Sequence, residues 1–135
     1  MTMPLRTRST MLCEHFTLGE FLPAGFDAQK IPPIHFENLK KLAQRLQILR
    51  ETVFEHRAVR ISPNGGGYRS ISLNRQVGGA SQSYHLTGMA ADIQVAGLTP
   101  RQTAERLSQW AGGLGLYPAH VHVDIGPHRR WMGHY

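Results

Sequence analysis

This sequence has a single cysteine and no long apolar run. Its one cysteine, Cys13, excludes an internal disulfide bond. Because Cys13 lies beside Leu12 and close to Phe16, we expect a buried thiol rather than a reactive one. No segment approaches the roughly 18 apolar residues of a membrane span. No apolar stretch follows the basic start MTMPLRTRST, so a signal peptide is not predicted either. These absences predict a protein that stays in the cytoplasm until another agent releases it.

Internal repeats and low-complexity segments are also absent. The 14 glycines and 8 prolines are scattered, which indicates turns rather than disorder. With 135 residues, 41% of them hydrophobic, the chain is long enough for one packed core and leaves little room for a second. We therefore expect a single domain over residues 1–135, with a loose amino-terminal arm over residues 1–13, and a monomer.

Acidic residues are scarce, with 9 Asp and Glu against 15 Lys and Arg. A positive surface attracts polyanions in general, so composition leaves both nucleic acid and the anionic bacterial wall open as partners. A nucleic-acid-binding protein would gather arginines and aromatic residues on one element, whereas the arginines here are spread along the chain. We therefore expect no nucleic-acid partner.

The hydrophobic pattern predicts helices first and then strands mixed with helices. The strongest signal is a recurrence of leucines at three- and four-residue spacing, which is typical of an amphipathic helix. Capping patterns at Thr17 and Thr99 predict two further helix starts. Helices are expected at residues 17–22, 36–54, 70–76 and 99–111, and strands at residues 58–62, 91–95, 114–117 and 120–125. This order predicts an α+β fold, a small antiparallel sheet with flanking helices.

The last predicted strand carries a polar face. In the segment His120-Val-His-Val-Asp-Ile125, side chains alternate between the two faces of the strand. The valines and Ile125 are expected in the core, which leaves His120, His122 and Asp124 together on the other side. Imidazole nitrogens and a carboxylate oxygen suit zinc. Taken alone, however, a His-x-His pair is more often the solvated face of an edge strand.

A second segment offers a histidine and an aspartate seven positions apart. Ser83-Tyr-His-Leu-Thr-Gly-Met-Ala-Ala-Asp92 combines His85 and Asp92 with a glycine that permits close packing. A turn that leads into a strand can bring both side chains onto one metal ion. The alternative is a glycine turn followed by an aspartate that neighbouring backbone holds, and spacing alone does not choose between the two.

Taken together, these segments resemble the zinc D-Ala-D-Ala peptidases, metallopeptidases that include wall carboxypeptidases and phage endolysins and share a hedgehog-like zinc fold. The shared pattern is Ser-x-His-x-x-Gly-x-Ala-x-Asp at residues 83–92, followed about thirty residues later by His-x-His. Other similar segments are Gly-Tyr-Arg-Ser, Gly-Gly-Ala-Ser, Gly-Gly-Leu-Gly and Glu-His-Phe-Thr-Leu-Gly-Glu-Phe, at residues 67–70, 78–81, 112–115 and 14–21. The resemblance covers about residues 13–131.

The resemblance implies a set of zinc ligands, and these are His85, Asp92 and His122. Three protein ligands leave the fourth coordination position for water. The resemblance also implies that Arg69 lies near the scissile carbonyl, where a guanidinium would stabilise the developing oxyanion. A surface salt bridge is the alternative for Arg69. Ser83 and its neighbour Tyr84 are expected to contact substrate, although Ser83 is equally suited to capping the local turn.

One position departs from the family pattern. Peptidases of this group usually carry an acidic residue three positions before the second zinc histidine, where it acts as general base, and here that position is Ala119. Three replacements are open: His120, because a histidine titrates near the working pH; Asp124, which is better suited to orienting a ligand; or a carboxylate from elsewhere. If none serves, zinc binding survives while hydrolysis is slow or absent.

Two further details affect the site. The turn that precedes Gly67 is longer than in relatives, which leaves the placement of Arg69 open. Trp131 lies just past the predicted site, where it either stacks on substrate or covers the sheet. We expect it to cover the sheet.

The resemblance therefore implies a zinc metallopeptidase that hydrolyses a D-Ala-containing peptide bond of peptidoglycan, as a carboxypeptidase or as a cross-link endopeptidase acting at the cell wall. By family analogy, a phage lysis enzyme or a virion-associated one fits a chain without a predicted signal peptide. The alternative is a catalytically impaired module that keeps zinc and binds wall peptides, or that serves as a phage structural component.

Overall fold

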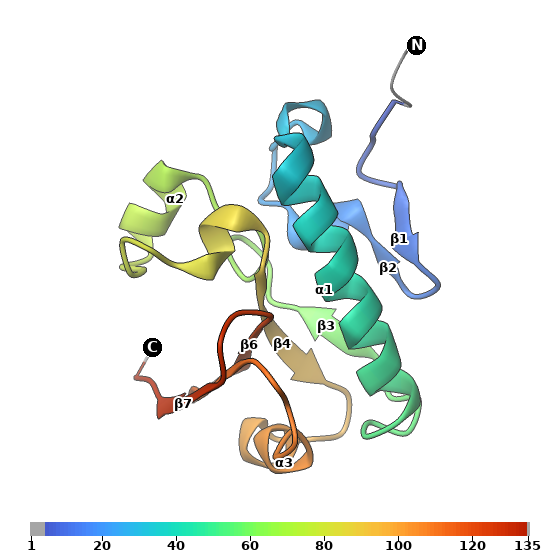
Figure 1. The fold of residues 1–135 in the computed structure, drawn as a ribbon, viewed down its shortest axis with the longest axis vertical. Coiled ribbons are helices and arrows are strands. Elements are labelled where there is room, and N and C mark those ends of the chain that lie inside the picture. Colours follow the sequence, from blue (N-terminus) through green and yellow to red (C-terminus); the bar gives the residue numbers. More distant parts are fainter. Residues whose placement is uncertain (1–4, 135) are drawn as a thin grey trace.

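The computed structural model describes residues 5–134, which form a five-stranded sheet, a small hairpin and the helices around them (Figure 1). The α-helices are α1 (Pro33–Glu51), α2 (Ile71–Gln76) and α3 (Pro100–Arg106). The short 3-10 helices are η1 (Leu18–Phe21), η2 (Ala28–Lys30) and η3 (Tyr84–Thr87). The strands are β1 (Met11–Cys13), β2 (Phe16–Thr17), β3 (Val59–Ile61), β4 (Ala90–Val95), β5 (Gly113–Leu116), β6 (Val121–Asp124) and β7 (Arg129–Met132).

The larger sheet has the strand order β3-β4-β6-β5-β7. Neighbouring strands are antiparallel except for β5 and β7, which are parallel. The predicted α+β class is confirmed, but the sheet is mixed rather than purely antiparallel. The cause is β7, a strand that the sequence analysis does not predict. Because β7 follows β6 after a short turn and lies beyond β5, it runs opposite to β6 and therefore parallel to β5.

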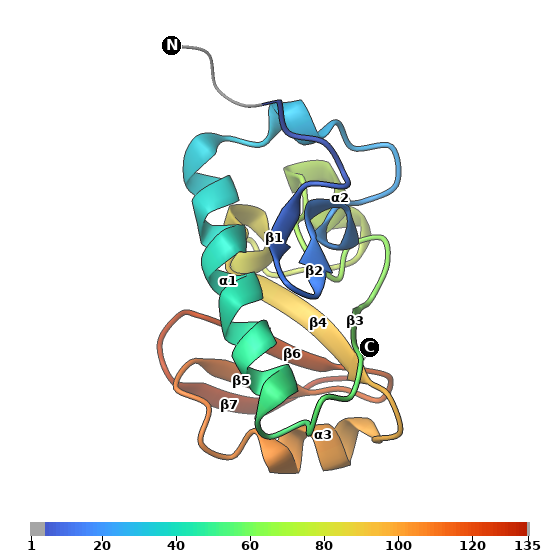
Figure 2. The same ribbon diagram turned by 90° about the vertical axis from the view of Figure 1, so that its right-hand side faces the viewer.

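The long helix predicted from the leucine spacing is α1. It begins at Pro33 rather than near Phe36, because a proline in the first helical turn leaves no N–H without a partner. It ends at Glu51, so Val53 lies beyond the helix and is partly exposed instead of joining the core. Buried side chains of α1 and of the sheet form one hydrophobic core, and α3 packs against β4, β5 and β6 (Figure 2).

Residues 5–13 belong to the amino-terminal arm that is expected over residues 1–13, and several of them contact the rest of the fold, while residues 1–4 lie outside the described residues. β1 and β2 form a hairpin that contacts α1. The guanidinium of Arg6 donates to the carbonyl oxygen of Ile31 at 2.8 Å, and that of Arg8 donates to Leu22 at 3.1 Å. Both acceptors lie more than a dozen positions along the chain, so local sequence does not reveal these attachments.

Cys13 lies in β1 and is partly buried. Its Sγ lies 3.4 Å from the carbonyl oxygen of Ala43 in α1. Burial raises the pKa of the Cys13 thiol, which disfavours the reactive thiolate.

The predicted helix start at Thr99 is confirmed. The Thr99 hydroxyl accepts a hydrogen bond from the backbone N–H of Gln102 at 3.1 Å, and the Gln102 side chain accepts one from the backbone of Thr99, so the two form a capping box. The helix ends at Arg106 instead of continuing towards the Gly112 region, and Leu107 and Trp110 are buried in the turns that follow.

The glycine-rich loop before Arg69 packs closely against other backbone. A Cβ atom at Gly66 would collide with the carbonyl oxygen of Ser62, and one at Gly67 would collide with that of Phe21. Glycine is required at both positions for this close approach. The loop also accepts a hydrogen bond from Asp92, whose backbone N–H lies 2.6 Å from the Gly66 oxygen. The loop is therefore a fixed wall beside β4.

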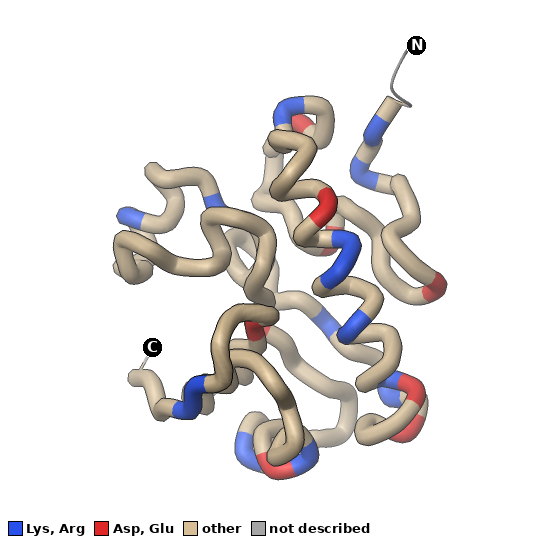
Figure 3. The backbone as a smooth tube through the Cα atoms, in the orientation of Figure 1, with Lys and Arg blue, Asp and Glu red and all other residues tan. Residues whose placement is uncertain are grey.

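Lysine and arginine residues lie on several elements, among them α1, α2, α3 and β7 (Figure 3). Within residues 5–134, no helix combines the length and the apolar character that crossing a membrane requires.

Candidate metal centre

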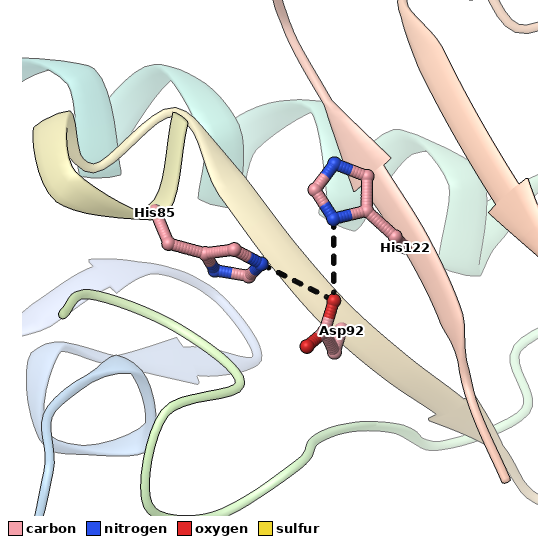
Figure 4. Close-up of side chains that lie close together, drawn as sticks. All are labelled: His85, Asp92 and His122. Carbon is pink, nitrogen blue, oxygen red and sulfur yellow. Dashed lines mark ion pairs between the residues drawn. The ribbon is translucent and has the colours of Figure 1, made fainter. Parts of the chain in front are cut away.

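Three side chains from separate elements converge on one face of the larger sheet. His85 comes from η3, Asp92 from β4 and His122 from β6, and their potential ligand atoms all lie within 4.8 Å of one another. The Oδ1 atom of Asp92 lies 3.3 Å from Nε2 of His85 and 3.3 Å from Nδ1 of His122 (Figure 4). The antiparallel register of β4 and β6 places Asp92 directly opposite His122. The structure thus brings together the three residues that the sequence pattern singles out.

Local backbone structure directs His85 towards the strands. The Ser83 hydroxyl caps η3 by accepting a hydrogen bond from the backbone N–H of His85 at 3.2 Å. Gly88 then ends η3 in the left-handed conformation, with φ 78°, and a Cβ there would lie 2.7 Å from the carbonyl oxygen of His35. The glycine between the histidine and β4 is therefore required by both conformation and space.

Hydrogen bonds at the outer nitrogens orient both imidazole rings. Nδ1 of His85 lies 2.7 Å from the carbonyl oxygen of Gly67. Since a carbonyl oxygen only accepts, Nδ1 carries the proton and the Nε2 lone pair of the neutral ring faces Asp92. Nε2 of His122 likewise donates to Oδ2 of Asp124 at 2.7 Å, so its Nδ1 lone pair faces Asp92. A second nitrogen that donates to a carbonyl or carboxylate is the usual arrangement of metal-binding histidines.

Electrostatic interactions keep the central carboxylate ionised. Burial by itself would raise the pKa of Asp92, but its interactions with the His122 and His85 rings, which attract the carboxylate when they are protonated, outweigh burial and hold that pKa far below its usual range. Burial lowers the pKa of His85, so its ring is neutral at pH 7. Burial acts in the same direction on His122, but the protonated ring donates to both Asp124 and Asp92, and these hydrogen bonds outweigh burial and raise the pKa of this ring. A metal ion bound here would compete with protons, chiefly at His122.

An open cleft of about 380 Å³ leads to these side chains. Its walls combine polar groups with aromatic rings: Arg69, Gln82, Ser83, Tyr84, His85, Tyr117, His122, Arg129 and Trp131 are among them. A volume of this size lies within the range of small-molecule and peptide-fragment sites. A metal ion on the three ligands would therefore face a space that can hold part of a substrate.

Residues 15–124 match the Peptidase M15 family. The chain belongs to this family. The match confirms the family resemblance inferred from the sequence motifs, and it ends at Asp124, the last residue of β6. Strand β7 lies beyond the matched segment of this M15 domain.

Curated relatives of the M15 domain include two endopeptidases and a carboxypeptidase. Peptidoglycan L,D-endopeptidase MepK of Escherichia coli (strain K12) is 41% identical over 73 residues, which are 48% of this chain and 40% of the relative. Probable peptidoglycan L,D-endopeptidase MepK of Haemophilus influenzae is 44% identical over 77 residues, 50% of this chain and 40% of the relative. Zinc D-Ala-D-Ala carboxypeptidase of Streptomyces albus G is 40% identical over 72 residues, 49% of this chain and 28% of the relative. The matched segment thus spans less than half the length of each relative.

Arg69 of the M15 domain is buried beside the candidate metal ligands. Its side chain is 4% exposed, its Nε donates to the carbonyl oxygen of Gly65 at 2.6 Å, and its Nη1 donates to Oδ1 of Asn74 at 3.1 Å. Its Nη2 lies 3.4 Å from Oδ2 of Asp92. The surface salt bridge considered for Arg69 is not what the structure shows. The guanidinium is a fixed cation in the wall of the cleft.

Asp124 is fully buried, with donors around both carboxylate oxygens. Besides the bond from His122, it accepts hydrogen bonds from the backbone N–H groups of Gly113 at 3.1 Å and Gly126 at 3.0 Å, and from Nη2 of Arg129 at 2.7 Å. Burial would raise the pKa of Asp124, but the hydrogen bond and the charge of His122 outweigh it and lower that pKa. Of the two roles considered for Asp124, this geometry suits the orientation of His122 rather than proton transfer.

His120 lies beside the candidate metal ligands. Its Nε2 lies 3.6 Å from Oδ2 of Asp92, and its ring stacks on Tyr117 with centroids 4.7 Å apart and planes at 15°. Burial lowers the pKa of His120, so the ring is neutral at pH 7 and can accept a proton. Ala119, at the position of the family's acidic residue, is exposed, and its carbonyl oxygen accepts a hydrogen bond from Gln94 at 2.9 Å.

The remaining predicted residues lie along the cleft. Ser83 caps η3 and lines the cleft at the same time, and Tyr84 follows it in the same wall. Trp131 packs over His122 with ring centroids 5.0 Å apart, and its Nε1 donates to the hydroxyl of Tyr117 at 2.9 Å. Trp131 therefore covers the sheet, as expected, and also forms part of the cleft wall.

Sequence reasoning missed Arg129 and Tyr117 as parts of the cleft wall. In the structure, partly buried and exposed residues alternate along Arg129–Met132. The sequence does not reveal this alternation, because two adjacent arginines give no indication of a buried face.

Proposed function

We propose that this M15 domain is a zinc-dependent peptidase that hydrolyses a peptide bond of peptidoglycan. One observation carries the proposal: His85, Asp92 and His122 converge beside an open cleft. A hydrogen bond at the outer nitrogen of each imidazole orients the ring. One relative is named a peptidoglycan L,D-endopeptidase, which supports the substrate, and another is named a zinc D-Ala-D-Ala carboxypeptidase, which supports the metal.

The donor atoms fit zinc. Two imidazole nitrogens and one carboxylate oxygen are a catalytic zinc set that leaves one coordination position open. The Nε2 lone pair of His85 and the Nδ1 lone pair of His122 face the same carboxylate, because their other nitrogens donate to Gly67 and Asp124. Zinc bound there would lower the pKa of a water ligand towards ~7 and polarise the substrate carbonyl.

Side chains of the cleft would supply the other functions. Arg69, fixed by Gly65 and Asn74, would donate to the scissile carbonyl oxygen as negative charge develops there. His120 is neutral, lies beside Asp92 and would take a proton from the attacking water and pass it to the leaving amine. Ser83 and Tyr84 would contact the peptide from the wall of the cleft.

The scissile bond is proposed to involve D-Ala, either at a peptide end or in a cross-link. The relatives carry both kinds of activity in their names, so carboxypeptidase and endopeptidase products are the two arms of the test. A phage lysis or virion-associated role stays a prediction, and release of fragments from intact walls by added protein would support it.

Ala119 favours a second candidate function, a module that binds zinc and wall peptides without rapid hydrolysis. Alanine cannot move a proton, and loss of a general base typically costs 10²–10⁴ in rate. This module would bind peptidoglycan fragments with zinc in place and release no product.

The deciding experiment measures turnover. Zinc-loaded protein is incubated with peptides that end in D-Ala-D-Ala and with cross-linked muropeptides, and the products are identified by mass spectrometry. His85→Ala and His122→Ala remove ligands, and His128→Ala is the matched control because His128 is exposed. We expect cleavage by the unaltered protein and by the control, and none by the ligand variants.

Two results would contradict the peptidase proposal in different ways. If the protein binds zinc and peptide but does not cleave the peptide, the second candidate function, the binding module, is supported instead. Cleavage that persists in both ligand variants would show that the proposed metal centre is not the catalytic site.

A further inference from the structure

Two rows of side chains run across the sheet from β7 to the metal centre. The register of β5 pairs Gly113 with Arg129 on one side and with Asp124 on the other. It likewise pairs Gly115 with Trp131 and with His122. Each row therefore consists of a large β7 side chain, a glycine of β5 and a polar residue of β6.

The glycines allow the β7 side chains to cross β5. A Cβ at Gly113 would collide with both Nη1 of Arg129 and Oδ2 of Asp124, and one at Gly115 would lie 2.5 Å from the Trp131 indole. Side chains on β5 would separate β7 from β6 at these positions. Their absence lets Arg129 reach Asp124 directly.

Arg129 makes contacts on three sides. Its Nη2 donates to Oδ2 of Asp124 at 2.7 Å, the same oxygen that accepts from His122. The carbon of its guanidinium lies 5.2 Å from the centre of the Tyr84 ring and 5.3 Å from that of Trp131, distances typical of cation–π contacts. The side chain is 38% exposed, whereas that of Asp124 is fully buried.

These contacts connect Arg129 to both histidine-bearing segments. Tyr84 immediately precedes His85 in η3, and Asp124 orients His122 in β6. A buried carboxylate is stable as an anion only when donors and a compensating charge surround it. Arg129 supplies that charge at Oδ2, the oxygen that His122 also contacts.

We infer that Arg129 is a positioning residue of the metal centre. It holds the Asp124 carboxylate in place, so that Oδ2 orients the outer nitrogen of His122, and through Tyr84 it holds η3 against β7. This inference rests on the proposed metal function. It also assigns a role to β7, which lies outside the segment matched to the family.

The test compares Arg129→Gln, Arg129→Lys and the matched control Arg130→Gln. Arg130 lies on the same strand, but its guanidinium donates to the carbonyl oxygens of Gly112 at 2.7 Å and Trp110, away from Asp124. Zinc affinity is measured by competition with a chromophoric chelator, and unfolding of the metal-free protein is followed in parallel. The His122 ring is observed by ¹⁵N NMR, which reports the nitrogen that carries the proton.

We expect Arg129→Gln to weaken zinc affinity about tenfold or more, the usual cost of losing a group that supports a metal ligand. Arg129→Lys keeps the charge and recovers part of the loss, and Arg130→Gln leaves affinity within about twofold. The ¹⁵N spectrum of Arg129→Gln should show a reduced share of the Nε2–H tautomer of His122. If Arg129→Gln does not fold, Arg129→Lys, which lacks the planar fork, must still bind zinc more weakly than the unaltered protein.

The outcomes separate the inference from the proposed function. Unchanged zinc affinity and an unchanged His122 tautomer in Arg129→Gln, with zinc bound by the unaltered protein, overturn the inference alone. Equal losses in Arg129→Gln and Arg130→Gln would also overturn it, because they would reflect general destabilisation. Failure of the unaltered protein to bind zinc overturns the proposed function, and the inference with it.

Discussion

Nδ1 of His85 lies 2.7 Å from the carbonyl oxygen of Gly67, and this bond attaches a predicted metal ligand to the glycine-rich loop. The loop reaches that position because Gly67 packs against the backbone of Phe21. Three segments distant in the sequence therefore determine the orientation of one imidazole ring.

Gly67→Ala tests this relationship. A Cβ at Gly67 would collide with the Phe21 carbonyl oxygen, so the loop must move and its carbonyl must leave His85. We expect a destabilisation of about 1–3 kcal/mol, as for other overpacked sites, and weaker zinc binding. Urea unfolding and chelator competition measure the two effects.

Gly78→Ala is the matched control for Gly67→Ala. Gly78 has φ 72° and open space around a Cβ, so its substitution strains the backbone without touching the metal centre. Stability should fall there while zinc affinity stays. Equal zinc affinity in Gly67→Ala and the unaltered protein would show that the Gly67 carbonyl does not orient His85.

Zinc affinity should fall as the pH is lowered. A proton on an imidazole nitrogen excludes the metal from it. Because the pKa of His122 is raised and that of His85 is lowered, protons compete first at His122, while Asp92, whose pKa is lowered, stays ionised. Dissociation constants measured between about pH 8 and pH 5 should increase towards the acidic end.

The Asp124→Asn variant tests whether protonation of His122 causes the loss of zinc binding at low pH. The hydrogen bond and charge of Asp124 raise the pKa of His122, so removing that charge lowers the pKa of the ring. The loss of zinc binding should then begin at a lower pH than in the unaltered protein. A loss that begins at the same or a higher pH would contradict the assignment of His122 as the first competitor.

His120→Ala should reduce kcat by 10²–10⁴ if this ring moves the proton, with zinc affinity nearly unchanged. The ring lies near Asp92 but does not belong to the three-ligand set. Introducing Ala119→Glu into His120→Ala places a carboxylate at the family's position and should recover part of the rate. Full activity in His120→Ala would assign proton transfer to another group.

Gly115→Ala should displace Trp131 from His122. The added Cβ would lie 2.5 Å from the indole, and we expect a loss of about 1–3 kcal/mol in the free energy of unfolding. The double variant Gly115→Ala/Trp131→Ala removes the collision, so its loss should be smaller than the sum of the two single losses. Additive losses would show that the two residues do not interact.

Local sequence patterns predicted the elements whose cause lies within a few residues. The leucine spacing of α1 and the capping box of Thr99 depend on neighbours along one helix. The alternation from Val121 to Asp124 depends on one strand, and it separates the core valines from His122 and Asp124. The proposed metal ligands could be named for the same reason, since each lies in a short motif.

The arrangement of those motifs was decided by contacts between distant segments. The edge that β7 joins, and hence the contact of Arg129 with Asp124, follows from the register of β7 on β5. The attachment of residues 5–13 follows from carbonyl groups that the arginine side chains meet only in the folded chain. No periodicity in these segments encodes the partner, because a hydrogen bond to backbone places no demand on the partner's side chain.

Residue identity alone supplied the chemistry of the site: two imidazoles, a carboxylate and a guanidinium, in motifs that belong to one family of peptidases. Folding decided which nitrogen of each imidazole faces Asp92, because Gly67 and Asp124 occupy the other one. It also decided that the Asp124 carboxylate accepts hydrogen bonds from His122, Arg129 and two backbone N–H groups. These outcomes depend on distance and burial, which arise only when strands and loops pack together.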